Sequence, residues 1–296
     1  MPEVVEVLKT VDFLKKVMKN EFITDIKILK GRYITHGPFD SYSVFKKNLP
    51  LKVIDIKNKG KFIYFILEKG FYLFSTLGLK GGWCYSINNT FRFPKLIDYI
   101  NDISLSKYRK IQLNNLNVSF HISNGKIIYY TDSLSFGTLK IVFKENDVIK
   151  KLDSLGPDIM YISFNLFKER ILRNINLDKY IANVIMNQKN ISGIGNYLRS
   201  DILWLSKISP LRKIKDLTDK DIKRLFNSAK ILTWGQYDFK KGVSLGWIKL
   251  SDKIPEYYGR NFFAYMCDTD IYGNKIVLNK EIDKERTIYW VPDRQI

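Results

Sequence analysis

The sequence contains few of the residues that bind metal ions or form disulfides. Its 296 residues include two cysteines, Cys84 and Cys267, and two histidines, His36 and His121. A structural zinc site takes four such ligands, so one forms here only if all four converge. Two cysteines also give no disulfide framework, which indicates a reducing, intracellular location. We interpret Cys267 as a small buried hydrophobic residue.

Long apolar segments are also missing. The apolar stretches, such as residues 62–67, are far shorter than the roughly 20 residues that cross a bilayer, so we expect no membrane association. The acidic residues Glu3, Glu6 and Asp12 argue against a secretory signal, and we expect a protein that is not secreted. No internal repeat or low-complexity tract is evident.

Acidic residues are the scarcer of the two charged classes. Lys and Arg number 49 and Asp and Glu 30, so the formal net charge is +19, and hydrophobic residues make up 45% of the chain. A globular chain this basic usually binds a polyanion, most often nucleic acid. Abundant Lys, Ile and Asn would also follow from an AT-rich genome, so charge alone favours a nucleic-acid partner only by a small margin.

Hydrophobic periodicity divides the chain into a β-rich part followed by a helical part. Residues 4–19 have apolar positions at helical spacing, and residues 22–144 contain several short strands with turn signals. The clearest strand is 116–123, where apolar residues alternate with polar ones and His121 lies on the polar side, facing solvent. Further helices are expected at 164–174, 178–188, 196–208 and 218–236, and a hairpin within 262–296.

These elements predict an α+β fold. An N-terminal helix and a β-sandwich form the first part, a mainly helical domain the second, and a small β-hairpin the end. We place the domains at residues 1–148, 149–261 and 262–296.

The second and third residues, Pro2 and Glu3, form a candidate catalytic pair. If Met1 is removed, the Pro2 nitrogen becomes a free secondary amine beside a carboxylate. An α-amino pKa near 8 leaves roughly a tenth of it neutral at pH 7, enough for attack on a carbon such as C1′ of a sugar. Met-Pro starts are common, however, so this pair alone favours no special role.

Residues 181–210 contain a candidate phosphate-binding turn. A helix ends near Gln188, and Gly193-Ile-Gly195-Asn196 then opens a second helix. Glycines at a helix start let the backbone approach an anion, and the unpaired N–H groups there point toward it. A tight helix–helix turn is the simpler interpretation of Gly-x-Gly taken alone.

The segment from Gln188 to Pro210 resembles the helix–two-turn–helix of the formamidopyrimidine-DNA glycosylase/endonuclease VIII family. The N-terminal Pro2-Glu3 pair is similar to that family's other signature. Further similarities follow in the family's order along the whole chain: Lys59-Gly-Lys61, Leu77-Gly-Leu79-x-Gly81, Asp132 ahead of Phe136-Gly137, and Leu155-Gly-Pro-Asp158.

The resemblance implies a role for each matching residue. Pro2 is the nucleophile at C1′ of the damaged nucleotide, Glu3 is the acid/base, and Glu6 supports the site. Lys61, on a hairpin tip, contacts phosphate near the lesion. The DNA phosphates are also bound by the group Gly193, Gly195, Asn196 and Arg286.

The terminal hairpin departs from most of the family, whose members usually close with a four-cysteine zinc finger. The expected cysteine positions are occupied by Thr269, Tyr272, Val291 and Arg294, which cannot make a thiolate site. The chain therefore resembles the zinc-less, endonuclease VIII-like branch, and we expect no zinc and no other cofactor. Packing of Tyr289, Trp290 and β-branched residues is expected to hold the hairpin instead.

Three further departures from the family pattern concern Leu134, the start motif and Asp201. Leu134 stands where the family often carries an Arg that contacts the base opposite the lesion, so we expect weak discrimination of that base. Leu79 and Phe136 are the other expected void-filling residues, although a core position is about as consistent with either. At the start motif, Val4-Val5 replaces the usual Gly-Pro, and Asp201 replaces a common Glu with little expected effect.

We predict a bifunctional DNA glycosylase/AP lyase for oxidised bases, with pyrimidines and ring-opened purines favoured. It should act as a monomer on double-stranded or lesion-containing DNA, in the nucleus or cytoplasm. One alternative is a non-catalytic DNA-binding protein that has kept the helix–two-turn–helix. A generic basic, chromatin-like protein is the other, and it should bind undamaged DNA equally well with steep salt dependence.

Overall fold

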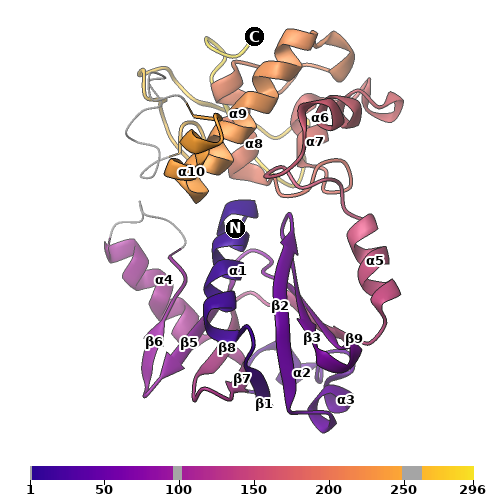
Figure 1. The fold of residues 1–296 in the computed structure, drawn as a ribbon. Helices are drawn as coiled ribbons and strands as arrows, with labels where there is room; N and C mark the ends of the chain where they lie inside the picture. The colour runs from indigo at the N-terminus through magenta and orange to yellow at the C-terminus, as the bar shows by residue number, and fades with distance from the viewer. Residues whose placement is uncertain (1, 96–101, 249–261) are drawn as a thin grey trace. The chain divides into compact units, whose positions relative to one another are not determined.

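The computed structural model describes residues 2–95, 102–248 and 262–296 of the chain (Figure 1). The chain divides into two compact units, the first ending at Ser154 and the second beginning at Leu155. The boundary expected after residue 148 falls inside helix α5 (Glu145–Asp153). The boundary expected at residue 261 lies outside the described residues.

The first unit is built on one antiparallel sheet of nine strands. Their order across the sheet is β6-β5-β8-β7-β1-β2-β3-β4-β9. The register shifts between Ile23 and Asp25 of β1, and again between Val53 and Asp55 of β2, where bulges bend the sheet. The strands are β1 (Phe22–Ile28), β2 (Leu51–Lys59), β3 (Phe62–Leu67), β4 (Tyr72–Thr76), β5 (Gly81–Ile87), β6 (Thr90–Arg92), β7 (Leu116–Ile122), β8 (Ile127–Asp132) and β9 (Thr138–Val142).

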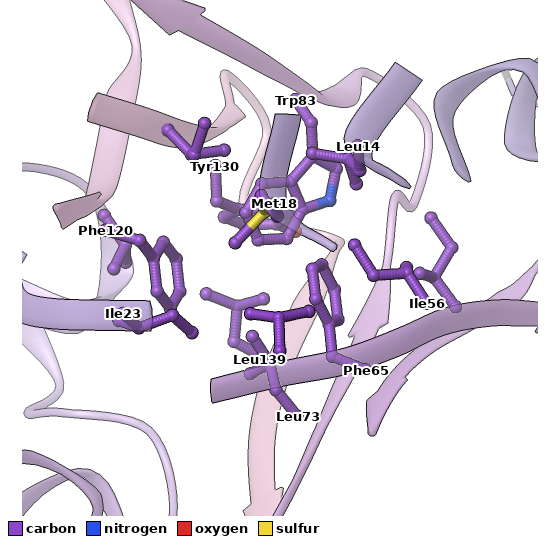
Figure 2. Packing of buried hydrophobic residues seen from close by; sticks show 14 of the residues in the cluster. Leu14, Met18, Ile23, Ile56, Phe65, Leu73, Trp83, Phe120, Tyr130 and Leu139 are labelled. Carbon is purple, nitrogen blue, oxygen red and sulfur yellow. The ribbon is translucent and has the colours of Figure 1, made fainter. Parts of the chain in front are cut away.

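Contacts between distant strands show that this sheet folds over on itself. Strands β3 and β5 are five positions apart, which is about 24 Å across a flat sheet. The rings of Phe65 and Trp83 on these strands nevertheless lie 5.3 Å apart, and Trp83 Nε1 donates to Ser75 Oγ of β4 at 3.2 Å. Figure 2 shows Phe65 and Trp83 converging with Phe120 in one core. The predicted β-sandwich is therefore confirmed as two halves of a single sheet.

Helix α1 (Val4–Met18) joins these two halves, since it packs on β2 and β3 and also on β5. Its buried positions are spaced as the sequence predicted, and Leu14 and Met18 enter the core with Phe65 and Trp83 (Figure 2). The burial of this apolar face, rather than helix propensity, fixes the helix.

Three features of the first unit were not predicted. Short helices α2 (Arg32–Thr35) and α3 (Tyr42–Lys47) and the longer α4 (Asp102–Asn114) interrupt the region expected to be β-rich. Asn117 and Ser119 of β7 are buried, although the alternation predicted solvent exposure, while His121 is half-buried. Cys84 is buried, and that burial raises the pKa of its thiol to about 12.

The second unit is mainly helical, as predicted, with α8 packed along α9. Thr218 caps α9, since its hydroxyl accepts the N–H of Asp221 at 3.2 Å while Asp221 accepts the N–H of Thr218 at 2.9 Å. The helices are α6 (Phe164–Ile171), α7 (Ile181–Met186), α8 (Asn196–Ser206), α9 (Asp219–Tyr237) and α10 (Phe239–Ser244).

A two-stranded antiparallel hairpin closes the chain, as expected. It pairs β10 (Val277–Asn279) with β11 (Ile288–Trp290). Within residues 2–95, 102–248 and 262–296, no helix has both the length and the apolar character needed to cross a membrane.

Candidate active site

The start of α1 holds the candidate catalytic pair. Glu3 is the N-cap residue of the helix, and its backbone N–H donates to Glu6 Oε2 at 2.8 Å. Both carboxylates are buried, Glu3 with 1% of its surface exposed, and Val4 and Val5 next to them are buried as well. The helix N-terminus favours negative charge at this position. The Glu6 carboxylate thus holds the backbone between Pro2 and the helix. Its supporting role in catalysis stays a prediction.

Lys61 lies at the same end of the first unit as this pair. Lys15 Nζ is 3.3 Å from Asp55 Oδ1, which aligns the middle of α1 with the middle of β2. From Lys15 back to Glu3 the helix rises about 18 Å, and from Asp55 to the β2–β3 turn the strand advances about 17 Å. Figure 1 shows the start of α1 and the tip of this hairpin at one end.

The β2–β3 hairpin is braced below its tip. Lys59 pairs with Phe62 across the hairpin, so Gly60 and Lys61 form the two-residue turn. Lys59 Nζ donates to the carbonyl of Leu152 at 2.7 Å. The two lysines of the motif therefore differ, since Lys59 anchors the hairpin and Lys61 occupies its end.

The three expected void-filling residues are exposed at two loops of the first unit. Leu79 follows β4 with 41% of its surface exposed, and Leu134 and Phe136 follow β8 with 42% and 62% exposed. This excludes the alternative that Leu79 and Phe136 are core residues. Large apolar side chains exposed together on tight loops are typical of a binding surface.

A hydrogen-bond network fixes the loop that carries Leu134 and Phe136. The Asp132 carboxylate accepts the N–H of Leu134 at 3.0 Å and that of Gly137 at 2.6 Å. The N–H of Asp132 itself donates to buried Asn117 Oδ1. Arg32 of α2 donates to the carbonyl of Ser135 at 3.2 Å from the other side.

The two loops also touch each other directly. A Cβ atom at Gly78 would lie 2.6 Å from the carbonyl carbon of Phe136 and 2.6 Å from the nitrogen of Gly137, and Gly78 has a φ of +54°. Glycine is therefore required here both for the turn and for the close approach. The loops of Leu79 and Phe136 consequently form one rigid surface.

In the second unit, Gln188 organises the turn that precedes α8. Its Oε1 accepts the N–H of Gly193 at 3.0 Å, and its Nε2 donates to the carbonyls of Met186 and Ile194. Gly193 has a φ of +109°, which disfavours other residues. Its N–H braces the turn in this structure, which differs from the predicted role as a donor to phosphate.

Asn196 and Arg286 come together through the backbone of the hairpin. Gly195 is the N-cap of α8, and Asn196 is its first residue. Asn196 Nδ2 donates to the carbonyl of Thr287 at 3.1 Å, next to the exposed Arg286. The amide nitrogen has two N–H groups, so this bond is compatible with the predicted contact of Asn196 to phosphate.

Aromatic and charged contacts occupy the place of the four expected cysteines. Arg294 Cζ lies 4.3 Å from the ring centre of Trp204 and 4.8 Å from that of Tyr272, distances typical of cation–π contacts. Trp204 also stacks on Phe263 at 4.6 Å and donates to Asp270 Oδ2 at 3.0 Å. Two of the four positions, Tyr272 and Arg294, thus belong to one stack built on α8.

Further contacts of the hairpin involve Val291, Gln295 and Cys267. Val291 is buried, its N–H donates to Gln295 Oε1, and Gln295 Nε2 donates to the carbonyl of Ile208. Cys267 is half-buried rather than buried, and its thiol donates to the carbonyl of Phe262 at 3.3 Å. Among the side chains that the structure describes, no three His, Cys, Asp or Glu residues converge as a metal site.

Asp201 has a larger part than its sequence position suggested. It is buried in α8, and its Oδ1 accepts the N–H groups of Ala264 and Tyr265 at 3.0 and 3.2 Å. Burial raises the pKa of this carboxyl to about 6, although those hydrogen bonds act in the opposite direction. Asp201 therefore tethers the segment that leads into the hairpin.

Comparison with known proteins agrees with this geometry. The formamidopyrimidine-DNA glycosylase N-terminal domain matches residues 1–139, and the H2TH domain of the same glycosylase matches residues 155–235. The formamidopyrimidine-DNA glycosylase of Oceanobacillus iheyensis is 30% identical over 78% of this chain and 74% of its own length. The chain belongs to the formamidopyrimidine-DNA glycosylase family. The Mycoplasma genitalium member is 26% identical over 83% of this chain and 82% of its own length.

Solved structures of the family share the fold. Lactococcus lactis formamidopyrimidine-DNA glycosylase bound to DNA with an AP site superposes with a TM-score of 0.73 at 20% identity, covering 99% of both chains. MutM in complex with DNA containing carbocyclic 8-oxo-G gives a TM-score of 0.72 at 21% identity, with full coverage of both chains. The terminal hairpin, residues 262–296, lies outside both family-domain matches.

Several residues that shape this family member's site escaped the sequence-based prediction. Arg32, Asn117 and Trp204 were not singled out, because each acts on residues far along the chain. The sequence held no signal for Asn117 either, because the alternation of its strand predicted an exposed polar position. Asp132 was recognised as part of a motif, and the structure adds its function as the cap of the Leu134 loop.

We predict that Gly78→Ala disrupts the contact between the two loops. Gly125 provides a matched control, because it also has a positive φ of +79° but a Cβ atom there would meet no atom within 4 Å. Gly125→Ala should cost about 1 kcal/mol from backbone strain alone. Gly78→Ala should cost at least about 1 kcal/mol more through overpacking. Urea unfolding measures both, and equal costs would show that the loops do not depend on close contact.

Proposed function

We propose that this chain is a bifunctional DNA glycosylase and AP lyase that excises oxidised bases from DNA. The observation that carries the proposal is the buried, hydrogen-bonded setting of Glu3 beside Pro2, with Lys61 at the same end of the first unit. A protein that only bound DNA would have no need of an ordered secondary amine next to a buried carboxylate. Membership of the family supports the same conclusion.

The chemistry follows from the groups at the start of α1. After removal of Met1, the Pro2 lone pair forms a bond to C1′ as the bond from C1′ to the damaged base breaks, and the base leaves with the proton that the Pro2 nitrogen gives up. Glu3 in its acid form protonates the ring oxygen as the bond from C1′ to that oxygen breaks, which leaves a cationic iminium and the Glu3 carboxylate. That carboxylate then accepts a C2′ proton as β-elimination expels the 3′ phosphate, and δ-elimination expels the 5′ phosphate. Lys61 supplies positive charge for the backbone phosphate near the lesion.

The loops and the second unit supply the binding functions. The target base must leave the stack before Pro2 can reach C1′, and the exposed Leu79, Leu134 and Phe136 are suited to fill the vacated space. Asn196 and Arg286 bind phosphate, which positions the DNA without reading its sequence.

We further propose that oxidised pyrimidines and ring-opened purines are the preferred substrates. Related structures are described with an oxidised-pyrimidine DNA, for the Lactococcus lactis protein, and with 8-oxo-G DNA, for MutM. The related structures thus hold both classes of lesion and do not decide the substrate of this chain. The argument from the chain itself is Leu134, which offers apolar surface but no hydrogen bonds to the base opposite the lesion. The resemblance to the endonuclease VIII-like branch supports the same preference.

The terminal hairpin is proposed to function without zinc. Thr269, Tyr272, Val291 and Arg294 do not fit the metal, since none provides a thiolate or an imidazole. The stack of Arg294 on Trp204 gives an alternative means of holding the hairpin.

Replacing Pro2 tests the covalent mechanism. Pro2→Gly should lose the borohydride-trapped enzyme–DNA complex and should cut an AP-site duplex far more slowly, while DNA affinity stays within about threefold. Glu3→Gln should slow strand cleavage by at least about 100-fold, as expected for loss of acid–base assistance. Pro38→Gly, at an exposed proline, is the matched control. Full cleavage by Pro2→Gly would show that Pro2 is not the nucleophile. No strand cleavage and no trapped species with the parent protein, once its mass shows Met1 removed, would leave only the non-catalytic DNA-binding alternative.

Lesion preference is measurable by trapping on duplexes with thymine glycol, a ring-opened purine or 8-oxoguanine. The first two should react faster, and the identity of the opposite base should have little effect. Leu134→Arg should introduce a preference for opposite cytosine of about tenfold, because a good base-edge contact is worth about 1–3 kcal/mol. Faster reaction of 8-oxoguanine opposite cytosine by the parent protein would contradict the proposed preference.

Metal analysis tests the zinc-less hairpin. The purified protein should contain far less than one zinc per chain, and EDTA should leave its unfolding temperature and DNA affinity unchanged. Arg294→Ala should weaken DNA binding with EDTA absent or present, because it removes the cation–π contacts with Trp204 and Tyr272. Stoichiometric zinc, or loss of binding in EDTA, would contradict the proposal.

A further inference from the structure

Arg199 of α8 is buried completely, which is unusual for an arginine and calls for an explanation. It lies one helical turn after Asn196, on the same side of α8. Its side chain has 0% exposed surface and forms an ion pair with Asp283, from Nη1 to Oδ2 at 2.7 Å. Removing two charges from water is costly unless both are well bonded, so such a pair indicates a specific task.

Three partners of Arg199, namely Asn196, Asp283 and Arg286, belong to the two elements proposed to bind phosphate. One guanidinium nitrogen, Nη2, donates to Asn196 Oδ1 and also lies 3.5 Å from the carbonyl oxygen of Arg286. The other, Nη1, holds Asp283, which lies three residues before Arg286. The guanidinium fork therefore contacts the start of α8 and the hairpin loop at the same time.

Asp283 in turn fixes the backbone of the loop. Its second oxygen, Oδ1, accepts the N–H of Glu285 at 3.1 Å and the N–H of Arg286 at 3.2 Å. On the far side of Arg286, the carbonyl of Thr287 accepts a hydrogen bond from Asn196 Nδ2. The backbone of Arg286 is thus held before, at and after the residue, while its side chain remains exposed.

The helix before the turn adds one more bond to this loop. Asn183 of α7 donates from Nδ2 to the carbonyl of Ile282 at 2.7 Å. The loop from Ile282 to Thr287 is otherwise rich in exposed charged residues and has no core of its own. Holding such a loop before binding reduces the ordering cost that an association otherwise carries.

We propose that Arg199 is a positioning residue that couples the two phosphate-binding elements, by fixing Asn196 and the loop of Arg286 in one arrangement. The inference rests on the proposed function, because it assumes that Arg286 contacts phosphate. Arg199 itself touches no DNA. It acts through Asp283 and Asn196, and it supplies from inside the protein the order that four cysteines and a metal would otherwise give to a finger.

The test uses Arg199→Met combined with Asp283→Asn. This pair removes both charges together, and the amide introduced in place of the Asp283 carboxylate retains an oxygen for the N–H groups of Glu285 and Arg286, so no unpaired charge is buried. Parent-like circular dichroism and unfolding temperature check folding. Should the pair fail to fold, Arg199→Lys replaces it, since lysine keeps the charge but cannot form the fork. Asp178→Ala, which breaks an exposed ion pair with Lys215, is the matched control.

The double variant should raise KM for a lesion duplex by about 5- to 20-fold, with kcat within about threefold. The slope of log affinity against log salt should fall by about one, as for Arg286→Ala, because one phosphate contact is lost. In the Arg286→Ala background, the double variant should cause a smaller loss than in the parent protein, because only the positioning of Asn196 remains to be lost, and it should leave the salt slope unchanged. The Asp178→Ala control should leave all of these values unchanged.

Three results would overturn the inference. A folded double variant with parent KM and salt slope would show that Arg199 positions nothing. An undiminished loss in the Arg286→Ala background would show that it acts independently of Arg286. A parent-like salt slope in Arg286→Ala would show that Arg286 makes no contact with phosphate, which the inference assumes. Salt slopes are measured on binding alone, so they remain informative if no covalent complex forms and the catalytic proposal fails.

Discussion

A chain terminus can attack a sugar carbon only if the fold holds it still, and termini are ordinarily the least ordered part of a domain. For the attack proposed for Pro2, the residues that follow it meet this constraint. Val4 and Val5 are buried in the core, Glu3 caps the helix, and Glu6 accepts the N–H of Glu3. The apolar face of α1 is in turn fixed by both halves of the folded sheet. The position of Pro2 therefore depends on the same core that Trp83 and Phe65 build (Figure 2).

The hairpin at the other end of the chain meets a similar need by other means. A zinc ion orders a finger by binding four side chains at one point. In the zinc-less arrangement proposed above, the ordering is spread over α8, which contributes Asn196, Arg199 and Asp201 near its start and Trp204 near its end. One helix can therefore hold both the segment that leads into the hairpin and the loop of the hairpin, provided that the polar side chains of the helix are buried with their partners.

Periodicity and local motifs were sufficient to predict a large part of this structure. Helix α1, strand β7 and the capped start of α9 were found because their signals lie within a few neighbouring residues. The family motif also predicted that Lys61 occupies a hairpin tip. Weakly amphipathic α4 was missed, since its apolar residues do not gather on one face.

What could not be predicted has a common physical cause. Arg199 and Asp283 are 84 residues apart, and nothing near either one indicates an ion pair. Leu79 and Phe136 are residue types that usually lie in a core. Their exposure is evident only from the structure, where they lie on two loops that touch at Gly78. These features depend on contacts between segments that are distant in the sequence, and a local sequence pattern does not predict such contacts.

The charges of this protein divide into two kinds with different consequences. The net charge of +19 supplies attraction to any DNA, and that attraction depends on salt and is independent of damage. The ionisable groups of Glu3, Glu6 and Arg199, which are buried, and of Asp283, which is 12% exposed, contribute little to that field, because each is paired or bonded inside the fold. Their effect is to fix positions, and a position can distinguish a flipped nucleotide from a stacked one. Under the function proposed above, selectivity for damage depends on these fixed positions, acting with three exposed apolar side chains.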